Sequence, residues 1–195
     1  LDGTDSDAVE ACAADIKNEH GRLDGIANCI GSMLLKPAHL TSAEEWRETL
    51  RLNLDSAFAS VRAAAKTMRS DGGAVVFVST AAAGIGLPNH EAIAAAKAGI
   101  EGLMRSAAAT YAGDKLRFNT VAPGMTETPM TEKLLKSDAA RKTSLAAHPL
   151  GRLGKPEDIA ACIAWLLQPE NDWITAQVIA VDGGLSTLKK PAAQR

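Results

Sequence analysis

The sequence predicts an α/β fold in which helices cover both faces of a parallel β-sheet. The first observation is a set of short apolar segments, such as residues 74–79 (AVVFVS), that lack the alternation of a strand with one solvent-exposed face. Segments of this kind are typical of strands that are buried on both faces. The second observation is that longer stretches with apolar residues at helical spacing separate these segments along the chain. Such alternation is the pattern of a parallel sheet whose strands are joined by helices.

The first half of the chain contains two predicted helices and a strand. Residues 7–19 are expected to form an amphipathic helix, because apolar side chains recur there at helical spacing. Residues 25–30 are a candidate for a short buried strand. Ser42, three residues before Glu45, predicts a capping box at the start of a long helix. An apolar stripe continues this helix to Met68, and Asn53 lies on or beside the stripe, which is an unusual place for an amide.

The second half repeats the alternation. The strand 74–79 is followed by a predicted helix at 89–112 and by predicted strands at 117–121 and 177–181. Pro156 is expected to open the last helix, because proline suits the first helical turn.

The domain organisation follows from length and composition. A chain of 195 residues suits one domain, here residues 1–195. Residues 125–148 vary in composition and are interpreted as a lid over the pocket, with Met125, Met130, Leu134 and Leu135 as a possible apolar lining. Residues 189–195 are expected to form a flexible tail.

Composition excludes several classes of function. A net charge of −2 gives no electrostatic reason to expect nucleic acid or an anionic membrane as partner. No apolar run approaches the roughly 20 residues that span a bilayer, and no targeting segment is recognisable at the N-terminus. Cys12, Cys29 and Cys162 are widely spaced and lack a CxxC pair, so they are expected to be buried free thiols in the cytoplasm, with no metal site.

One segment carries most of the functional information. In residues 75–97 (VVFVSTAAAGIGLPNHEAIAAAK), Thr80 ends an apolar strand, Ile93 follows thirteen residues later, and Lys97 follows after four more. This spacing resembles the active-site segment of the short-chain dehydrogenase/reductase family, in which Ser, Tyr and Lys form the catalytic set. The resemblance implies a Rossmann-like doubly wound sheet and an NAD(P)-dependent oxidoreductase that acts on a carbonyl compound or secondary alcohol.

Further motifs extend the resemblance over nearly the whole chain. Residues 28–31 (NCIG) look like the family's Asn-Asn-Ala-Gly turn and keep its first and last members, Asn28 and Gly31. Asn53 matches the catalytic asparagine. Residues 119–124 (NTVAPG), with Pro123 and Gly124, and then Thr128 resemble the segment that holds the nicotinamide. Similar C-terminal landmarks are residues 149–152 (PLGR), 156–158 (PED) and 181–184 (VDGG).

The resemblance implies a role for each matched residue. Thr80 replaces the serine that polarises the carbonyl, since it keeps a hydroxyl donor and acceptor. Lys97 would hold the ribose, and Asn53 would support a water relay. Each residue also has a plainer interpretation: Thr80 as a turn cap, Lys97 as a solvated lysine, and Asn53 as a buried amide that bridges helix and loop.

The first departure from the family is Ile93, which stands where the proton-donating tyrosine belongs. Isoleucine has no proton to transfer. Tyr111, the only tyrosine, lies fourteen residues past Lys97, or about 21 Å along a helix, and cannot replace it. His90 precedes Ile93 by about one helical turn, and because imidazole is a common acid or base in enzymes, His90 is a candidate for that role. The alternative is a surface histidine with Glu91 as its only proton partner.

The second departure is the front of the chain. Family members begin with a strand, a glycine-rich turn and a helix that hold the pyrophosphate, and no part of this sequence matches that first βαβ portion. Asp2 instead matches the residue that touches the adenine, at the end of a third strand. The residues that distinguish NAD from NADP are not recognisable, so either cofactor is expected.

Three functions remain open at this stage. The first is the NAD(P)-dependent oxidoreductase, and the second is a catalytically impaired relative that binds a nucleotide or small molecule. The third is a structural subunit whose sheet is completed by another chain. The resemblance also implies a homodimer or homotetramer built on the long helix through residues 58–68 and on the helix 89–112. A strand at 25–29 is expected at or near an edge of the sheet.

Overall fold

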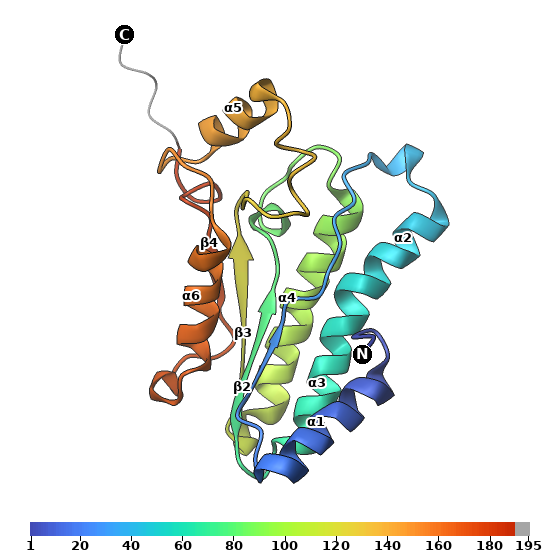
Figure 1. The fold of residues 1–195 in the computed structure, drawn as a ribbon, viewed down its shortest axis with the longest axis vertical. Coiled ribbons are helices and arrows are strands. Elements are labelled where there is room, and N and C mark those ends of the chain that lie inside the picture. The colour runs from blue at the N-terminus through green and yellow to red at the C-terminus, as the bar shows by residue number, and fades with distance from the viewer. Residues whose placement is uncertain (190–195) are drawn as a thin grey trace.

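The computed structural model describes residues 1–189 and shows a four-stranded parallel sheet (Figure 1). The strands are β1 (Gly25–Asn28), β2 (Gly73–Val78), β3 (Leu116–Pro123) and β4 (Val178–Val181), and they lie in the order β1-β2-β3-β4. All three pairings are parallel, so the predicted parallel sheet is confirmed. β1 is an edge strand, as expected for residues 25–29.

Helices lie on both faces of this sheet. One face is covered by α3 (Ser56–Thr67) and α4 (Glu91–Tyr111), with α1 (Ser6–His20) packed on α3. The opposite face is covered by α6 (Pro156–Leu167). α2 (Ala43–Leu50) leads towards α3, and α5 (Asp138–Ala147) lies beyond the carboxyl ends of the strands.

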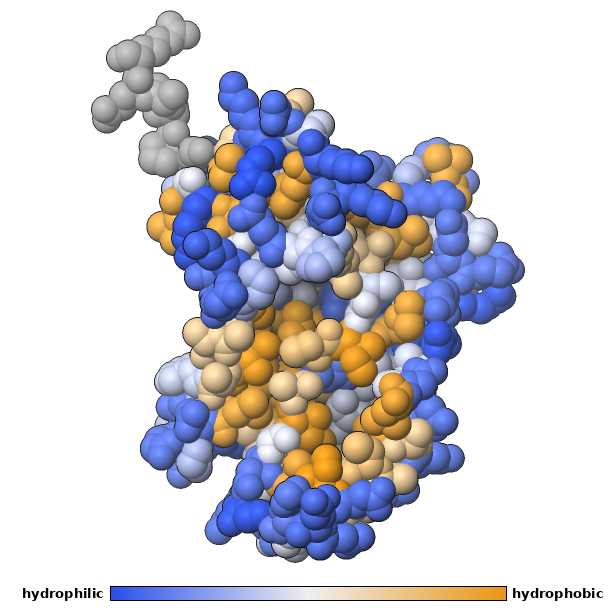
Figure 2. All heavy atoms as spheres, viewed as in Figure 1, coloured by the Kyte–Doolittle hydropathy of each residue, from blue (hydrophilic) through white to orange (hydrophobic). Residues whose placement is uncertain are grey.

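Two apolar clusters form the core, one on each side of the sheet. Val75 and Phe77 of β2 pack with α3 and α4, whereas Val76 packs with α6. Because successive side chains of a strand point to opposite faces, this arrangement explains why the segment 74–79 has no polar alternation. Figure 2 shows apolar side chains gathered in the middle of the face that carries α6, over the strands.

The predicted long helix contains an interruption at Asn53. The capping box of Ser42 and Glu45 is present at its start, as the sequence predicts. Between α2 and α3, however, the turn Arg51–Asp55 is π-helical, and Asn53 is fully buried within it. Turns of this kind insert an extra residue into an α-helix and are frequent at functional sites.

The segment 125–148, interpreted as a lid, contains the helix α5 at residues 138–147. The three cysteines are free as expected, but Cys29 is exposed and Cys12 and Cys162 are only half-buried. Apart from Lys189, the expected flexible tail lies outside the described residues. No helix in the described part of the chain is long and apolar enough to cross a membrane.

Candidate active site

A cleft of about 680 Å³ opens at the carboxyl ends of β2 and β3. Open parallel sheets bind their ligands at this end of the strands, because the connecting loops leave a crevice there. Thr80, His90 and Ile93 line one part of the cleft, and residues 123–126 and 128–131 line another. Five of the ten predicted site residues thus line this cleft, namely Thr80, His90, Pro123, Gly124 and Thr128.

Thr80 stands where β2 ends. Its hydroxyl oxygen accepts a hydrogen bond from the Ala82 N–H at 3.3 Å and so caps the short turn Ala81–Ala83. The capping role anticipated for Thr80 is therefore present. Because the oxygen accepts in this bond, the hydroxyl proton remains available to donate to a ligand in the cleft.

Ile93 lies in the first turn of α4 and is nearly buried, with 5% exposure, while it still lines the cleft. Lys97 follows four residues later, on the same side of the helix. Position 93, where the family resemblance implies a tyrosine, therefore lines the same cleft as Thr80. In this chain the position offers only an apolar surface.

Lys97 is not a solvated lysine. It is 7% exposed, and its ammonium donates to the Val78 carbonyl at 2.8 Å. Burial lowers the pKa of Lys97 from 10.5 to about 8, and the Cys29 thiolate opposes this effect. A buried amine that titrates close to neutral pH can exchange protons there, which a surface lysine does not do.

Asn53 lies beside Lys97 at Gly31. A Cβ atom added at Gly31 would stand 2.6 Å from Asn53 Oδ1 and 3.1 Å from Lys97 Nζ, so only glycine fits between them. The Asn53 amide donates to the Thr49 carbonyl at 2.9 Å and to Ser32 Oγ at 3.1 Å, and its oxygen accepts from the Ser32 N–H at 3.3 Å. The amide thus bridges helix and loop, as its plainer interpretation holds.

His90 is the residue that immediately precedes α4, and it lines the cleft. Its Nδ1 is 2.7 Å from the Pro88 carbonyl oxygen, so Nδ1 carries a proton. The expectation that Glu91 is its proton partner is wrong, because the Glu91 carboxylate accepts from the Ala38 N–H instead. Within residues 1–189, no group of the chain bonds Nε2 of His90, which leaves that nitrogen available for chemistry.

The segment expected to hold the nicotinamide also lines the cleft. Pro123 ends β3, Gly124 follows it, and Thr128 contributes a hydroxyl that is 3.2 Å from the Thr131 hydroxyl. Together with the buried amine of Lys97, these groups fit the nicotinamide and ribose end of a dinucleotide, which needs a polar anchor next to an apolar wall.

Four predicted cofactor residues lie outside the lining of this cleft: Lys97 and Gly31, described above, and Asn28 and Asp2. Asn28 is buried and ties the end of β1 to α3, because its amide donates to the Ser56 carbonyl at 2.8 Å and to Ser60 Oγ at 2.9 Å. Asp2 is exposed and accepts from the backbone and hydroxyl of Thr4 at 2.9 and 2.8 Å. These hydrogen bonds, with the nearby Arg51, hold the pKa of Asp2 below its ordinary value.

Sequence reasoning missed one wall of the cleft. Pro156, Ile159 and Ile163 of α6 line it, although their helical spacing indicates only a core face. Cys29 also lines the cleft, next to the Asn28–Gly31 turn. Of the four residues suggested as an apolar lining, Met125 and Met130 contribute, whereas Leu134 and Leu135 are not part of the cleft.

Known proteins resemble this chain in sequence. Residues 1–186 match the protein-family model described as enoyl-(acyl carrier protein) reductase. The chain is 37% identical over 188 residues to the 3-oxoacyl-[acyl-carrier-protein] reductase FabG of Thermotoga maritima. That match covers 95% of this chain and 75% of the relative.

Solved structures resemble it in fold. A short-chain type dehydrogenase/reductase from Mycobacterium ulcerans superimposes with a TM-score of 0.92 at 30% identity, over 98% of this chain and 70% of the other. The structure of ElxO with NADP bound gives a TM-score of 0.90 at 28% identity, over 96% of this chain and 77% of the other.

Proposed function

Because this chain belongs to the short-chain dehydrogenase/reductase family, we propose that it is an NAD(P)-dependent oxidoreductase that interconverts a small carbonyl compound and its secondary alcohol. The observation that carries the proposal is the cleft that Thr80 lines, next to the buried Lys97 and Asn53. The nicotinamide, when bound, supplies or accepts the hydride. The binding of NADP by the structural relative ElxO supports this class of cofactor.

The residues of this chain have separate tasks in the proposal. The Thr80 hydroxyl donates to the carbonyl oxygen of the substrate and so stabilises the negative charge that develops there. Lys97 and Thr128 hold the ribose and carboxamide ends of the cofactor. Asn53 holds the 31–32 loop against α2 and so keeps Gly31 next to Lys97.

The proton needs a donor other than residue 93. His90 is a titratable side chain that lines the same cleft, and its free Nε2 can carry or accept a proton once a substrate is bound. The second candidate is a water molecule held by Lys97, whose pKa of about 8 suits proton exchange near neutral pH.

Ile93 favours a second candidate function, that of a family member that binds a nucleotide or small molecule without turnover. In that case the cleft acts as a binding site only, and the apolar wall formed by Ile93, Met130 and Ile159 selects an apolar ligand. The two functions differ in one observable quantity, which is the transfer of hydride.

Hydride transfer is measured with NADPH or NADH that carries deuterium at C4, at millimolar concentration, against a panel of small ketones and aldehydes. Mass spectrometry of the alcohols detects the transferred deuterium. Labelled alcohol is expected with the wild-type chain and not with Thr80→Val or Lys97→Met. His90→Ala abolishes the label if His90 is the donor, whereas His39→Ala, at an exposed histidine, is the matched control. Binding without any label, in the wild type and in Ile93→Tyr alike, would establish the second function.

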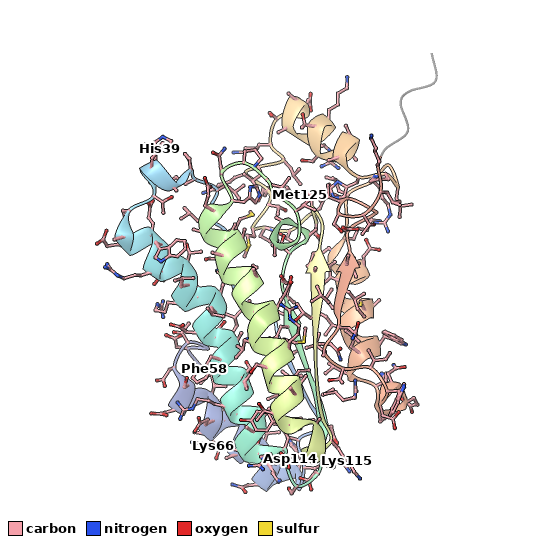
Figure 3. The ribbon with its side chains drawn as sticks, turned by 180° about the vertical axis from the view of Figure 1, so that it is seen from behind. His39, Phe58, Lys66, Asp114, Lys115 and Met125 are labelled. Atoms are coloured by element: carbon pink, nitrogen blue, oxygen red, sulfur yellow. The ribbon has the colours of Figure 1, made fainter. Side chains whose placement is uncertain are left out.

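We also propose that the chain forms a homodimer or homotetramer through α3 and α4. Phe58 of α3 is 48% exposed, and Ala95 and Ala98 present an exposed small-residue surface on α4 (Figure 3 labels Phe58). Small side chains allow two helices to approach closely, and a large exposed aromatic gains most from burial. A second contact through residues 177–185, at the β4 edge, would complete a tetramer.

Two further parts of the proposal concern the lid and the cell compartment. Residues 125–148 act as the lid, since Met125 and Met130 line the cleft and α5 lies beyond the carboxyl ends of the strands. The cytoplasm is the proposed location, which the three unpaired cysteines support.

A further inference from the structure

His148 occupies a different position from the other three histidines. It follows the last residue of α5 and is 2% exposed, whereas His20 and His39 are exposed and His90 is half-buried. The ring stands next to Gly124, because a Cβ atom at Gly124 would lie 2.7 Å from His148 Nε2. Burial of a whole imidazole in a loop region needs hydrogen bonds for both ring nitrogens.

Both nitrogens have partners, and the partners determine the protonation state. The Met125 N–H donates to Nε2 at 3.1 Å, and Nδ1 lies 2.7 Å from the Ser144 carbonyl oxygen. Since a backbone N–H can only donate, Nε2 must be unprotonated; since a carbonyl can only accept, Nδ1 must carry the proton. The geometry therefore requires a neutral imidazole in one tautomer.

The ring connects three elements around the cleft. Gly124 and Met125 follow β3 and line the proposed active site, and Figure 3 shows Met125 at the end of the sheet near α5. Ser144 belongs to α5, and Gly183, which follows β4, would place a Cβ atom 3.7 Å from the His148 ring. The start of the lid is thus bonded through His148 to the end of the lid.

Charged groups also surround the ring. Arg152, Asp158 and Asp182 line the same cavity of about 450 Å³ as His148. Arg152 and Asp158 neutralise each other in a two-point ion pair at 2.6 and 2.9 Å. Burial works to raise the pKa of Asp182, but hydrogen bonds from Ser186 and Gly184 hold it below its ordinary value, and a protonated His148 would lower it further. The Asp182 carboxylate is therefore ionised near neutral pH and favours a positive charge on the ring.

We propose that His148 is a positioning residue for the nicotinamide-binding loop: as a neutral imidazole it anchors Gly124–Met125, and its protonation releases them. A proton on Nε2 turns the acceptor of the Met125 hydrogen bond into a donor that faces another donor. The loop then loses its anchor, while Asp182 stabilises the imidazolium that forms. Acidification that protonates the ring therefore frees this loop at the edge of the cleft. This inference about His148 depends on the proposed function in one respect only, which is that this loop binds the cofactor.

The test is hydrogen exchange at the Met125 amide, followed by NMR at pH 8 and pH 5.5 without cofactor and corrected for the intrinsic exchange rate. Wild-type protection is expected to fall about two- to tenfold on acidification, which is the change that one neutral hydrogen bond supports. In His148→Gln the amide oxygen can accept from Met125 without titrating, so the protection of the Met125 amide is expected to be the same at both pH values. His148→Phe fills the volume without an acceptor and is expected to show low protection at both pH values.

Two controls separate a local effect from unfolding. The amide of Val76 in β2 reports the stability of the sheet, and His39→Gln removes an exposed histidine. If His148→Phe does not fold, the comparison of the wild type with His148→Gln still shows whether protonation of His148 releases the Met125 amide. Constant wild-type protection at Met125, or an equal fall in His148→Gln, would overturn the proposal. A wild-type fall without any pH dependence of NADP affinity would instead overturn the assignment of this loop to the cofactor.

Discussion

Replacement of the buried lysine by an uncharged side chain of similar length, Lys97→Met, is expected to change how stability depends on pH. In the folded protein burial lowers the pKa of Lys97 from 10.5 to about 8. Between these two values the unfolded chain binds more protons than the folded chain does. The free energy of unfolding of the wild type therefore rises with pH over this range, relative to a variant that cannot titrate.

The size of the effect follows from the same two values. At pH 7 the lysine is charged in both the folded and the unfolded state, so the fold bears the whole free-energy cost of burying the charge. At pH 10 the folded protein contains the neutral amine, and most of this free-energy cost is absent. Integration from pH 7 to pH 10 gives a gain of about 2.5 kcal/mol for the wild type relative to Lys97→Met. The change per pH unit is steepest near pH 9.

The assay is urea unfolding followed by tryptophan fluorescence at four pH values, under reducing conditions. Both proteins carry Cys29→Ser, because the Cys29 thiol, whose pKa burial raises, interacts with Lys97 and would add its own titration to the measurement. Lys133→Met, at an exposed lysine, is the matched control and is expected to follow the wild type. If the free energies of unfolding of the wild type and Lys97→Met change with pH in parallel, within about 0.5 kcal/mol, the reasoning is refuted and Lys97 is hydrated.

Three other outcomes are expected. Ile93→Tyr should raise hydride transfer to a carbonyl substrate by roughly 10²–10⁴-fold, because a positioned proton donor supplies this much, while Ile93→Phe should not; equal rates in the two variants would place the donor elsewhere. Ala176→Gly should stabilise the fold by about 0.5–1 kcal/mol. The reason is that Ala176 has φ 60°, a left-handed conformation that costs a non-glycine residue roughly 1–2 kcal/mol. A lower free energy of unfolding for this variant in chemical denaturation would contradict the prediction. Phe58→Asp should reduce the oligomer to monomers in light scattering at about 20 μM, since a carboxylate buried between helices has no partner; an unchanged mass would exclude α3 from the interface.

Affinity for the cofactor is expected to be weak in the 195-residue chain. The sequence contains no three-glycine turn between a strand and a helix, so the main-chain donors that usually hold a pyrophosphate have no counterpart in it. Each neutral hydrogen bond contributes about 0.5–1.5 kcal/mol, and the loss of several lowers affinity by some orders of magnitude. Calorimetric titration with NADPH checks this, and submicromolar binding would show that other groups hold the phosphates.

The sequence by itself determined most of the strands and helices and the spacing of the site residues within them. The apolar run before Thr80 predicts a strand, because a strand buried on both faces has no polar position. The four-residue interval from Ile93 to Lys97 places both side chains on one side of a helix, since 3.6 residues make a turn. The capping box at Ser42 follows from local hydrogen bonding alone. Local rules of this kind depend on neighbours in the chain, so the sequence displays them directly.

Tertiary structure alone decided the environment of each side chain. Lys97 is buried and its pKa depressed because Val78, at the end of β2, and Gly31, in the loop after β1, close around it. Ile159 and Ile163 follow the pattern of a core helix, and only the packing of α6 on the sheet makes them a wall of the cleft. His148 stands in a segment with no recognisable signal, yet it joins residues 23 positions apart through one hydrogen bond to Met125. Burial and contact between distant residues depend on how the layers pack, and no periodicity within a segment encodes them.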